Sequence, residues 1–394
     1  MTAPIPFDAA LALIGQATPL GSETVQLAGA AGRTLAADVI ATAPAPRTAV
    51  STMDGYAVVD AATAPGEWLQ LVGESRPGAG WLGAIGSGQA ARIFTGAAVP
   101  EGATRVIIQE HAERDGDRVR FTPGYGPATY IRIAGSDFAA GDVLVPAGTR
   151  LTPRGLVAAA AADCGEVTVA RRPKLAILAT GDELARPGQA SEGPEAIPDT
   201  ISFAVAALAQ QAGADLAAMD LCADEPRRLE KLAGELLDIA DVVVVTGGAS
   251  VGERDFAKVS FAAHGLEVAF EKAAIKPGKP VWFGRAGDAL VLGLPGNPTS
   301  AMVTAALFLR PLLARLQGAD DAHRWRTLPL AAPLPATDER ETFARARWDD
   351  AGLTPLGNQD SGAQSPLAEA DWLIRCPAGQ AALPAGTLVS ALAF

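Results

Sequence analysis

The sequence predicts a multidomain protein in which a central doubly wound α/β domain is joined to smaller, mostly β domains. Three observations favour this class. The chain has 394 residues, which suggests roughly two to four domains. Apolar strand-like runs alternate with helical segments between residues 174 and 316, as in a parallel sheet with helices on both faces. On either side of this region, prolines separate short β-like runs.

The composition favours large folded cores and argues against several classes of partner. Hydrophobic residues make up 49% of the chain and charged residues only 19%, which is not the balance of a disordered chain. The net charge of −12 argues against binding to nucleic acid or to an anionic membrane surface. The three cysteines and three histidines are scattered, so neither a disulfide framework nor a zinc site is favoured. We therefore expect a cytoplasmic protein.

The first 170 residues predict a small linker domain that is interrupted by a β insertion. Phe7, Leu11 and Ile14 recur at helical spacing, which predicts a helix over residues 6–15. Thr152 and Pro153 supply the cap and first turn of a second helix over residues 152–164. Between these helices, short β-like runs lie among prolines at 68–72, 89–95, 105–109 and 118–122. We therefore predict a linker domain at 1–41 plus 141–170 and a mostly β insertion at 42–140.

Residues 171–322 carry the alternating pattern of the α/β domain. Strands are predicted at 174–179, 215–221, 241–245 and 289–294, and helices at 201–212, 226–239, 256–264 and 299–316. Pro226 stands at a first helical position and Gly213 follows a helix end, as helix boundaries usually show. After Gly318 prolines again separate short β-like runs, and strands are predicted at 327–330, 342–348 and 387–393. Residues 323–394 are therefore predicted to form a small C-terminal domain resembling a β-barrel.

The most informative segment is the loop that follows the apolar run Val242–Val245. Thr246–Asp255 combines glycines and hydroxyls and ends in an acid at the start of a predicted helix. Glycines let the backbone approach a ligand closely, and a helix start offers unpaired N–H groups to phosphate. The loop lacks the Gly-Lys-Ser/Thr of a Walker A motif, and its glycine spacing is not that of a dinucleotide fingerprint. Binding of a phosphorylated ligand is favoured, and an ordinary turn is the alternative.

Two further loops of the same kind follow other predicted strands of this sheet. Thr180–Glu183 and Pro295–Ser300 both mix glycine with a hydroxyl or an amide. Ligands of open α/β sheets bind beyond the carboxyl ends of the strands, so we expect the three loops to lie together. Three unrelated turns remain the alternative.

Charged residues near these loops favour an anionic ligand and a divalent cation. Lys276–Pro280 places two lysines on a turn stiffened by two prolines, which suits an oxyanion, although a solvated turn is equally compatible. Several acids lie in or beside the loops: Asp182, Glu183, Asp199, Asp224, Glu253 and Asp255. Carboxylates beside phosphate favour Mg²⁺, which takes one or two of them together with phosphate oxygens. Helix capping is the alternative for those acids that precede a helix.

The β insertion contains a second group of candidate residues. Asp54 lies in Ser51–Ala57, between a methionine and a Gly-Tyr turn, where an Asp that merely begins a β-turn is the alternative. Thr95 and the following glycine come after a strand-like run and are placed to donate to an anion. Arg132 and Asp137 form a basic–acidic pair, for which a surface salt bridge is the alternative.

Six of these motifs, taken in order, resemble the molybdopterin molybdenumtransferase family, which includes MoeA and the E domain of gephyrin. They are Met53–Ala57, Thr95–Ala97, Thr180–Leu184, Gly247–Asp255, Lys276–Pro280 and Leu294–Pro298. The resemblance runs nearly end to end and therefore covers more than the α/β domain, which alone would also fit a pterin adenylyltransferase.

The resemblance implies four subdomains, a molybdopterin-binding α/β domain and an elongated homodimer. The active site would lie between the α/β domain of one subunit and the β insertion of the other. The implied reaction is a Mg²⁺-dependent transfer in which adenylylated molybdopterin and molybdate give molybdenum cofactor and AMP. Transient contacts with the pterin adenylyltransferase, and with molybdoenzyme apo-forms or their chaperones, are implied as well.

The resemblance also assigns roles to residues. The catalytic acids would be Asp54 and Asp137 from the partner subunit, with Glu183, Asp224 and Asp255, and the last three would also hold Mg²⁺. The pterin pyrophosphate would be held by Gly247, Gly248, Ser250 and Gly252. The dithiolene and molybdate would lie near Lys276, Lys279, Pro295, Gly296, Asn297, Pro298 and Ser300, with Arg345 and Ser361 handling the oxyanion. The remaining substrate-binding residues would be Thr95, Thr180, Gly181 and Asp182.

The chain departs from the family pattern at three places. Ile133, Ala134 and Ser136 stand where the family usually has further basic or acidic residues, Ile201 replaces an Asn, and Gly362 replaces a His. The leading hypothesis is an active molybdenum insertase, because all the main acids remain. The second hypothesis is a non-catalytic relative that binds or carries molybdopterin or its molybdenum cofactor.

Overall fold

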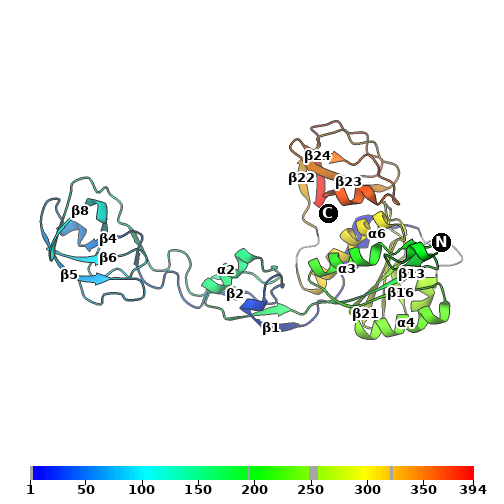
Figure 1. The fold of residues 1–394 in the computed structure, drawn as a ribbon, viewed down its shortest axis with the longest axis horizontal. Coiled ribbons are helices and arrows are strands. Elements are labelled where there is room, and N and C mark those ends of the chain that lie inside the picture. The colour runs from blue at the N-terminus through cyan, green and yellow to red at the C-terminus, as the bar shows by residue number, and fades with distance from the viewer. Residues whose placement is uncertain (1–2, 194, 248–255, 320–322) are drawn as a thin grey trace.

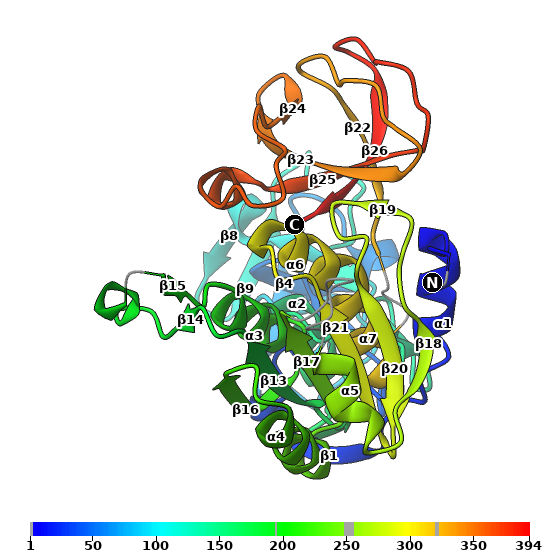
Figure 2. The ribbon, with the colours of Figure 1, turned by 90° about the vertical axis from the view of Figure 1, so that its right-hand side faces the viewer.

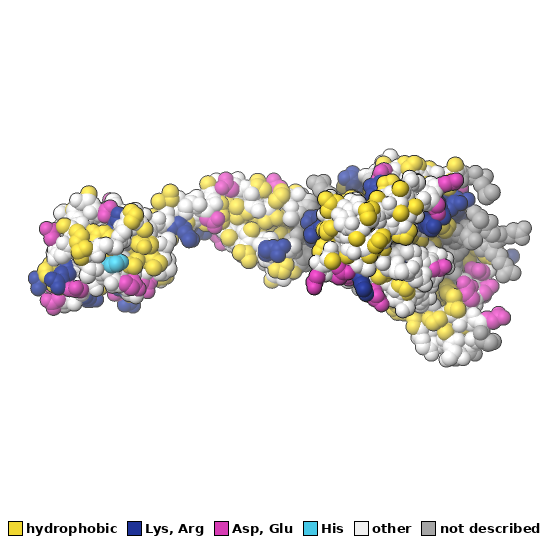
Figure 3. Space-filling view, turned by 90° about the horizontal axis from the view of Figure 1, so that it is seen from above, with side chains coloured by type: hydrophobic (Ala, Val, Ile, Leu, Met, Phe, Trp, Pro, Cys, Tyr) yellow, Lys and Arg dark blue, Asp and Glu magenta, His cyan; other side chains and the backbone are white. Residues whose placement is uncertain are grey.

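The protein is elongated and consists of four domains. The computed structural model describes residues 3–193, 195–247, 256–319 and 323–394. The β insertion lies at one end, the linker domain in the middle, and the α/β and C-terminal domains lie together at the other end (Figure 1). The same separation is visible from above, where a narrow waist joins the insertion to the rest (Figure 3).

The α/β domain is built on a six-stranded mixed sheet. Its strands, in spatial order, are β16 (Asp215–Cys222), β13 (Lys174–Thr180), β17 (Val242–Thr246), β21 (Ala289–Leu294), β20 (Trp282–Ala286) and β18 (Glu267–Phe270). The first four are parallel and correspond to the predicted strands, while β20 and β18 add an antiparallel edge that the sequence pattern did not reveal. A small parallel pair, β14 (Leu184–Ala185) and β15 (Ile197–Pro198), follows β13.

Helices cover both faces of this sheet, as predicted. One face carries α3 (Ile201–Gln211) and a long helical stretch made of α6 (Pro298–Thr304), the π segment Ala305–Leu309 and α7 (Arg310–Leu316). The other face carries α4 (Pro226–Ile239) and α5 (Phe256–Ala262). The stretch Pro298–Leu316 is apolar and long enough to cross a membrane, but 78% of its most apolar window is buried in the protein, as in a core helix.

The N-terminal helix packs against the α/β domain, although its sequence position placed it with the linker. Helix α1 (Phe7–Ile14) has the predicted bounds within two residues and buries Phe7, Ala10 and Ile14 in the same core as the sheet. The Phe7 ring lies 5.6 Å from that of Phe308 and 4.9 Å from that of Phe343 in the C-terminal domain. Helix α1 therefore joins the α/β and C-terminal domains.

The linker domain has its own small core. It consists of β1 (Ser22–Gln26), β2 (Val39–Ile40), β11 (Val143–Val145), α2 (Pro153–Ala161) and β12 (Glu166–Ala170). Strand β1 pairs with β12 and β2 with β11, so the chain segments before and after the insertion form one domain through these strand pairs. Thr152 caps α2 by accepting a hydrogen bond from the Gly155 N–H at 3.3 Å, as its position predicted.

The β insertion and the C-terminal domain are both mostly β, as predicted. The insertion is entered and left through β3 (Val50–Ser51) and β10 (Ile131–Arg132), and its sheet has the order β7 (Arg105–Ile108), β4 (Gly55–Val58), β6 (Gln89–Ile93), β5 (Leu69–Ser75), β9 (Arg118–Phe121) and β8 (Ala112–Asp115). The C-terminal sheet has the order β19 (Ile275–Lys276), β23 (Glu341–Asp349), β25 (Trp372–Cys376), β26 (Leu388–Ala393) and β22 (Arg326–Pro329), with β24 (Gly352–Pro355) beside β23. Strand β19 comes from the α/β domain and lies at the junction of the two domains (Figure 2).

Candidate active site

The described parts of the three glycine-containing loops meet at the carboxyl edge of the sheet, as predicted. Strands β13, β17 and β21 are parallel neighbours, and Thr180, Gly247 and Pro295 lie where each of them ends. Gly247 has φ of 86°, and a Cβ placed on it would lie 2.2 Å from the carbonyl oxygen of Thr180. A Cβ on Gly296 would lie 3.7 Å from the Cα of Gly247. The loops therefore touch one another through their backbones, and only glycine fits at position 247.

Acidic groups gather on the β13–β16 side of this edge. The Asp182 carboxylate accepts a hydrogen bond from the Asp224 N–H at 3.0 Å, which joins the loops after β13 and β16. A Cβ on Gly181 would lie within 2.9 Å of both carboxylate oxygens of Glu183, so this carboxylate rests on the Gly181 backbone. Asp199 instead caps α3, because its carboxylate accepts hydrogen bonds from the N–H groups of Ile201 and Ser202 at 3.2 and 3.1 Å.

Two of the three predicted magnesium ligands, Glu183 and Asp224, belong to the described residues, and Asp255 does not. Glu183 and Asp224 lie at this edge, whereas Gly248, Ser250, Gly252, Glu253 and Asp255 fall outside the described residues. Among the residues that the structure describes, no group of three or more His, Cys, Asp or Glu side chains is arranged to hold a metal ion. One or two carboxylates are, however, the usual protein contribution to a Mg²⁺ ion that also binds substrate phosphate. The donor set of this edge fits that role.

The paired-lysine turn is fixed between two domains. Lys276 lies in β19, which pairs with β23 of the C-terminal domain, and its ammonium group contacts the Asp338 carboxylate at 2.9 Å. A Cβ on Gly278 would lie 2.3 Å from the Thr304 methyl group of α6, so the turn is pressed onto that helix. Lys279 is exposed, and no described side chain pairs with it. Of the two predicted oxyanion-binding cations, one is thus paired and one is available.

The start of α6 is tied to the C-terminal domain by polar side chains. Asn297 donates a hydrogen bond from its amide to the Ser361 hydroxyl at 3.0 Å, which brings two predicted site residues together. The Thr299 hydroxyl donates to the Ala363 carbonyl at 2.6 Å. Pro295 and Ser300 are buried, so only Gly296 and Asn297 of this turn are exposed.

Arg345 lies beneath this junction rather than facing solvent. It is 0% exposed, and its guanidinium group donates to the carbonyls of Asn358 and Asp360 at 3.2 and 3.1 Å. It also reaches the Thr299 hydroxyl at 3.4 Å, and burial lowers the pKa of the guanidinium. The predicted oxyanion-binding role of Arg345 stays a prediction. In this structure, Arg345 holds the loop that carries Ser361.

In the β insertion, Asp54 and Thr95 form a hydrogen-bonded pair. The Asp54 carboxylate accepts hydrogen bonds from the Thr95 N–H and from the Thr95 hydroxyl, both at 2.8 Å. These two bonds, the backbone one first, hold the pKa of Asp54 below its usual value, and the charge of Arg92 adds a smaller effect in the same direction. Arg92 donates to the Gly55 carbonyl at 2.8 Å and to the Gln109 side chain at 2.7 Å.

Sequence analysis missed Arg92, although its position three residues before Thr95 on a strand-like run was a usable signal. It also missed Asp338, whose pairing with Lys276 depends on contact between distant parts of the chain. Asp137, Arg132 and Ile133 are all described and exposed, no ion pair joins Arg132 to Asp137, and the Asp137 backbone N–H donates to the Ala45 carbonyl at 3.0 Å. Ile133 is 66% exposed at this end of the molecule.

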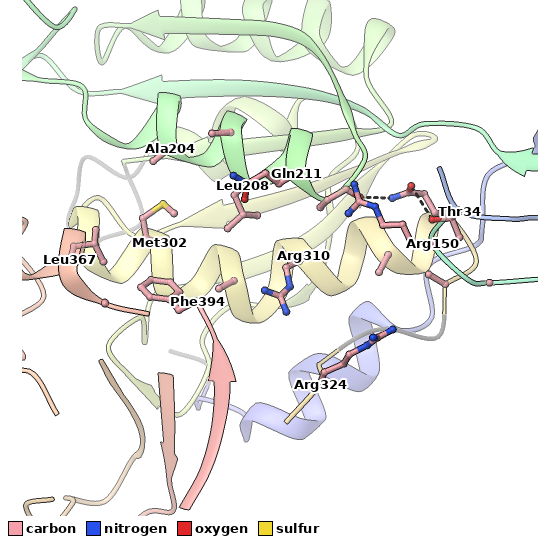
Figure 4. Close-up of a pocket in the computed structure, with 18 residues that line it drawn as sticks. Thr34, Arg150, Ala204, Leu208, Gln211, Met302, Arg310, Arg324, Leu367 and Phe394 are labelled. Carbon is pink, nitrogen blue, oxygen red and sulfur yellow. Dashed lines mark hydrogen bonds between the residues drawn. The ribbon is translucent and has the colours of Figure 1, made fainter. Parts of the chain in front are cut away.

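These groups belong to two separate parts of the chain. Asp54, Thr95 and Asp137 belong to the insertion, whose sheet lies at the opposite end of the molecule from the sheet of the α/β domain (Figure 1). A groove of about 580 Å³ lies elsewhere, between α3 and the α6–α7 stretch, with Leu208, Met302 and Arg310 among its walls (Figure 4). None of the described residues that line this groove is a predicted site residue.

Comparisons with known proteins cover nearly the whole chain. Residues 5–164 match the family model of the MoeA N-terminal region (domain I and II), residues 176–315 that of a probable molybdopterin binding domain, and residues 327–394 that of the MoeA C-terminal region (domain IV). A molybdopterin molybdenumtransferase of Nostoc sp. is 33% identical and covers 93% of this chain and 87% of its own length. That of Haemophilus influenzae is 37% identical, with 83% and 80% covered.

A solved structure supports the same assignment over the full length. The molybdopterin biosynthesis MoeA protein of Pyrococcus horikoshii aligns with a TM-score of 0.82 at 28% identity, and 99% of each chain is covered. The order of domains, the loops at the sheet edge and the matched relatives agree, and the chain belongs to the MoeA family of molybdopterin molybdenumtransferases.

Proposed function

We propose that this protein is a molybdenum insertase, which converts adenylylated molybdopterin and molybdate to molybdenum cofactor and AMP. The observation that carries the proposal is the meeting of the loops after β13, β17 and β21 at one sheet edge, in a chain that matches molybdopterin molybdenumtransferases over most of its length. This edge carries acids on its β13–β16 side, and the paired-lysine turn packs on α6, which follows β21. A ligand with both phosphate and oxyanion groups fits this division.

The α/β loops suit the pyrophosphate of the adenylylated pterin. At Gly247 the backbone of the loop after β17 contacts Thr180 at the end of β13. Because this residue has no side chain, a phosphate group can approach the backbone closely. Glu183 and Asp224 would hold Mg²⁺ together with phosphate oxygens, and this ion would neutralise charge on the departing AMP. The roles of Gly248, Ser250, Gly252 and Asp255 belong to the same proposal.

The molybdate oxyanion would bind between the lysine turn and the start of α6. Lys279 has no partner among the described side chains, so its ammonium group is available to an anion. Asn297 and Ser361 are linked by a hydrogen bond and add polar groups from two domains. Arg345, from below, fixes the loop that presents Ser361.

The second half-site would come from another copy of the chain, in a homodimer. Within one chain, β4, which directly follows Asp54, lies at the far end of the molecule from β13, which leads into the loop of Glu183 (Figure 1). An elongated shape of this kind allows two copies to exchange their insertions in a symmetric pair, each completing the site of the other. Asp54 and Thr95 would then face the α/β loops of the partner subunit.

The proposed reaction changes two sets of bonds. The dithiolene sulfurs form bonds to molybdenum, and their protons leave with displaced molybdate oxygen as water. The pyrophosphate bond to AMP breaks, and an oxygen of water or of molybdate forms the new bond to phosphorus. When water is the attacking group, a carboxylate such as that of Asp54 is suited to accept its proton.

The function is tested by mixing the purified protein with adenylylated molybdopterin, Mg²⁺ and molybdate and measuring AMP. Release of AMP that depends on molybdate, and that is lost in Asp54→Ala and in Glu183→Ala, is the expected result. Tight pterin binding without AMP release, while a reference insertase turns over, would instead favour the non-catalytic carrier. The exposed Ile133, in place of a family arginine, is the observation that favours this second candidate.

The proposed setting is the cytoplasm. Cys164, Cys222 and Cys376 are all free thiols, as expected in a reducing compartment. Transient contacts with the pterin adenylyltransferase, and with molybdoenzyme apo-forms or chaperones, would supply the substrate and receive the product.

A further inference from the structure

Asp338 contacts one of the two lysines that would bind the oxyanion. It lies in the C-terminal domain, three residues before β23 begins, and β23 pairs with β19 in the register Lys276–Thr342. This pairing brings the Asp338 carboxylate to 2.9 Å from the Lys276 ammonium group. The contact therefore joins the C-terminal domain to the lysine turn of the α/β domain.

The carboxylate is held in place independently of Lys276. Its other oxygen accepts a hydrogen bond from the Arg340 N–H at 3.0 Å, and the Arg340 guanidinium lies 3.8 Å away. The Asp338 backbone carbonyl also accepts a hydrogen bond from Gly379 at 2.7 Å. The hydrogen bond from Lys276, followed by the one from Arg340, lowers the pKa of Asp338, so the group is an anion at neutral pH.

The two lysines of the turn therefore differ in their surroundings. Lys276 is paired with Asp338, whereas Lys279 has no partner among the described side chains. The turn between them is pressed onto α6 at Gly278. An oxyanion that binds to both ammonium groups either displaces Asp338 from Lys276 or shares the Lys276 ammonium group with it.

We propose that Asp338 is a built-in carboxylate that competes with the oxyanion for Lys276 and thereby lowers the affinity of the lysine turn for it. The proposal rests on the proposed function, because it takes the lysine turn as the oxyanion site. Breaking the ion pair costs the same free energy whichever anion arrives, so the competition lowers the affinity for molybdate and for singly charged anions alike. Both side chains are about half exposed, at 51% and 44%, so the pair is easily broken and reformed.

The test is a direct titration of the full-length protein with molybdate alone, at neutral pH and low salt. In Asp338→Asn, which keeps the shape and removes the charge, molybdate binds about two- to five-fold more tightly than in the wild type, the range expected for loss of an exposed ion pair. The affinity for a singly charged anion such as nitrate rises in the same variant as well. Glu339→Gln removes an equal charge from the neighbouring exposed side chain and leaves affinity unchanged. Lys276→Gln combined with Asp338→Asn binds no more tightly than Lys276→Gln alone.

Three results would overturn the proposal. Equal gains in Asp338→Asn and Glu339→Gln would show a general charge effect. A gain that persists in the Lys276→Gln background would show that Asp338 does not act through Lys276. An unchanged affinity in Asp338→Asn, including the case in which neither the variant nor the wild type binds molybdate, would show that no competition exists. Because binding is measured without turnover, failure of the insertase function appears separately, as molybdate binding with the expected variant pattern but no AMP release.

Discussion

Replacing Gly247 with alanine should damage the sheet edge on which the site is built. Gly247 has φ of 86°, a conformation that costs a residue with a side chain about 1–2 kcal/mol. The added Cβ would also lie 2.2 Å from the carbonyl oxygen of Thr180 and 3.1 Å from its hydroxyl. Relieving that contact requires a movement of about 1 Å in a close-packed region. We expect a total cost of about 2–4 kcal/mol.

Hydrogen exchange measured by mass spectrometry can localise this cost, which a single melting curve of a multidomain chain cannot. Amides of β13 and β17 should exchange about 30- to 1000-fold faster in Gly247→Ala, since each 1.4 kcal/mol corresponds to tenfold. Amides of the β insertion should be unaffected. The adenylylated pterin should also bind more weakly, because the loop after β17 is displaced.

Gly296→Ala is the matched control. Its Cβ would lie 3.7 Å from the Gly247 Cα, which is an ordinary contact, and the backbone there does not have a positive φ. This substitution should lower the free energy of opening of β13 and β17, measured by hydrogen exchange, by less than about 0.5 kcal/mol. If Gly247→Ala and Gly296→Ala gave the same exchange rates, the close approach between the two loops would not have the importance that we assign to it.

Three further predictions concern single side chains. Thr95→Val removes one hydrogen bond from Asp54 and raises its pKa, so the acidic limb of the pH–rate profile should move to higher pH, whereas Thr95→Ser should restore it. Burial lowers the pKa of His323 to about 4, so the folded protein disfavours its protonation. Stability should be full above about pH 6.5 and fall by up to about 3 kcal/mol as pH drops towards 4, and His323→Gln should flatten that part of a urea-unfolding series. Arg345→Met removes the donor to the carbonyls of Asn358 and Asp360 and should destabilise the C-terminal domain by about 1–3 kcal/mol in thermal unfolding, and a variant as stable as the wild type would contradict this.

The parts of the fold that the sequence predicts are those set by local pattern. The valine run of β17 and the run of β21 are buried on both faces, and such strands read as continuous apolar segments. Helix α4 has its predicted bounds because Pro226 fixes the first turn. That the loops after β13, β17 and β21 lie together was predicted from sheet topology, because the carboxyl ends of parallel strands share one edge. No single residue indicated it.

The parts that the sequence does not predict depend on contacts between distant segments. Strand β18 is exposed along most of its length at the sheet edge and has no apolar alternation to mark it. The lysines were predicted only as part of a stiff turn, but Lys276 belongs to a strand that pairs with the sheet of another domain. Nothing local to Arg345 indicates that it is buried. Ile201 departs from the family pattern, and it is 7% exposed and belongs to the α/β core, so an apolar residue is suited to its position.

The central claim is that each site combines the α/β loops of one subunit with the insertion of another. Subunit complementation tests it most directly. Asp54→Ala and Glu183→Ala proteins, each inactive alone, are mixed in equal amounts under conditions in which native mass spectrometry shows that subunits exchange. A shared site predicts that half of the dimers are mixed and that each contains one intact site, so AMP release should recover to about a quarter of the wild-type rate. No recovery in a mixture that does contain mixed dimers would place both acids in a site formed by a single chain and contradict the account.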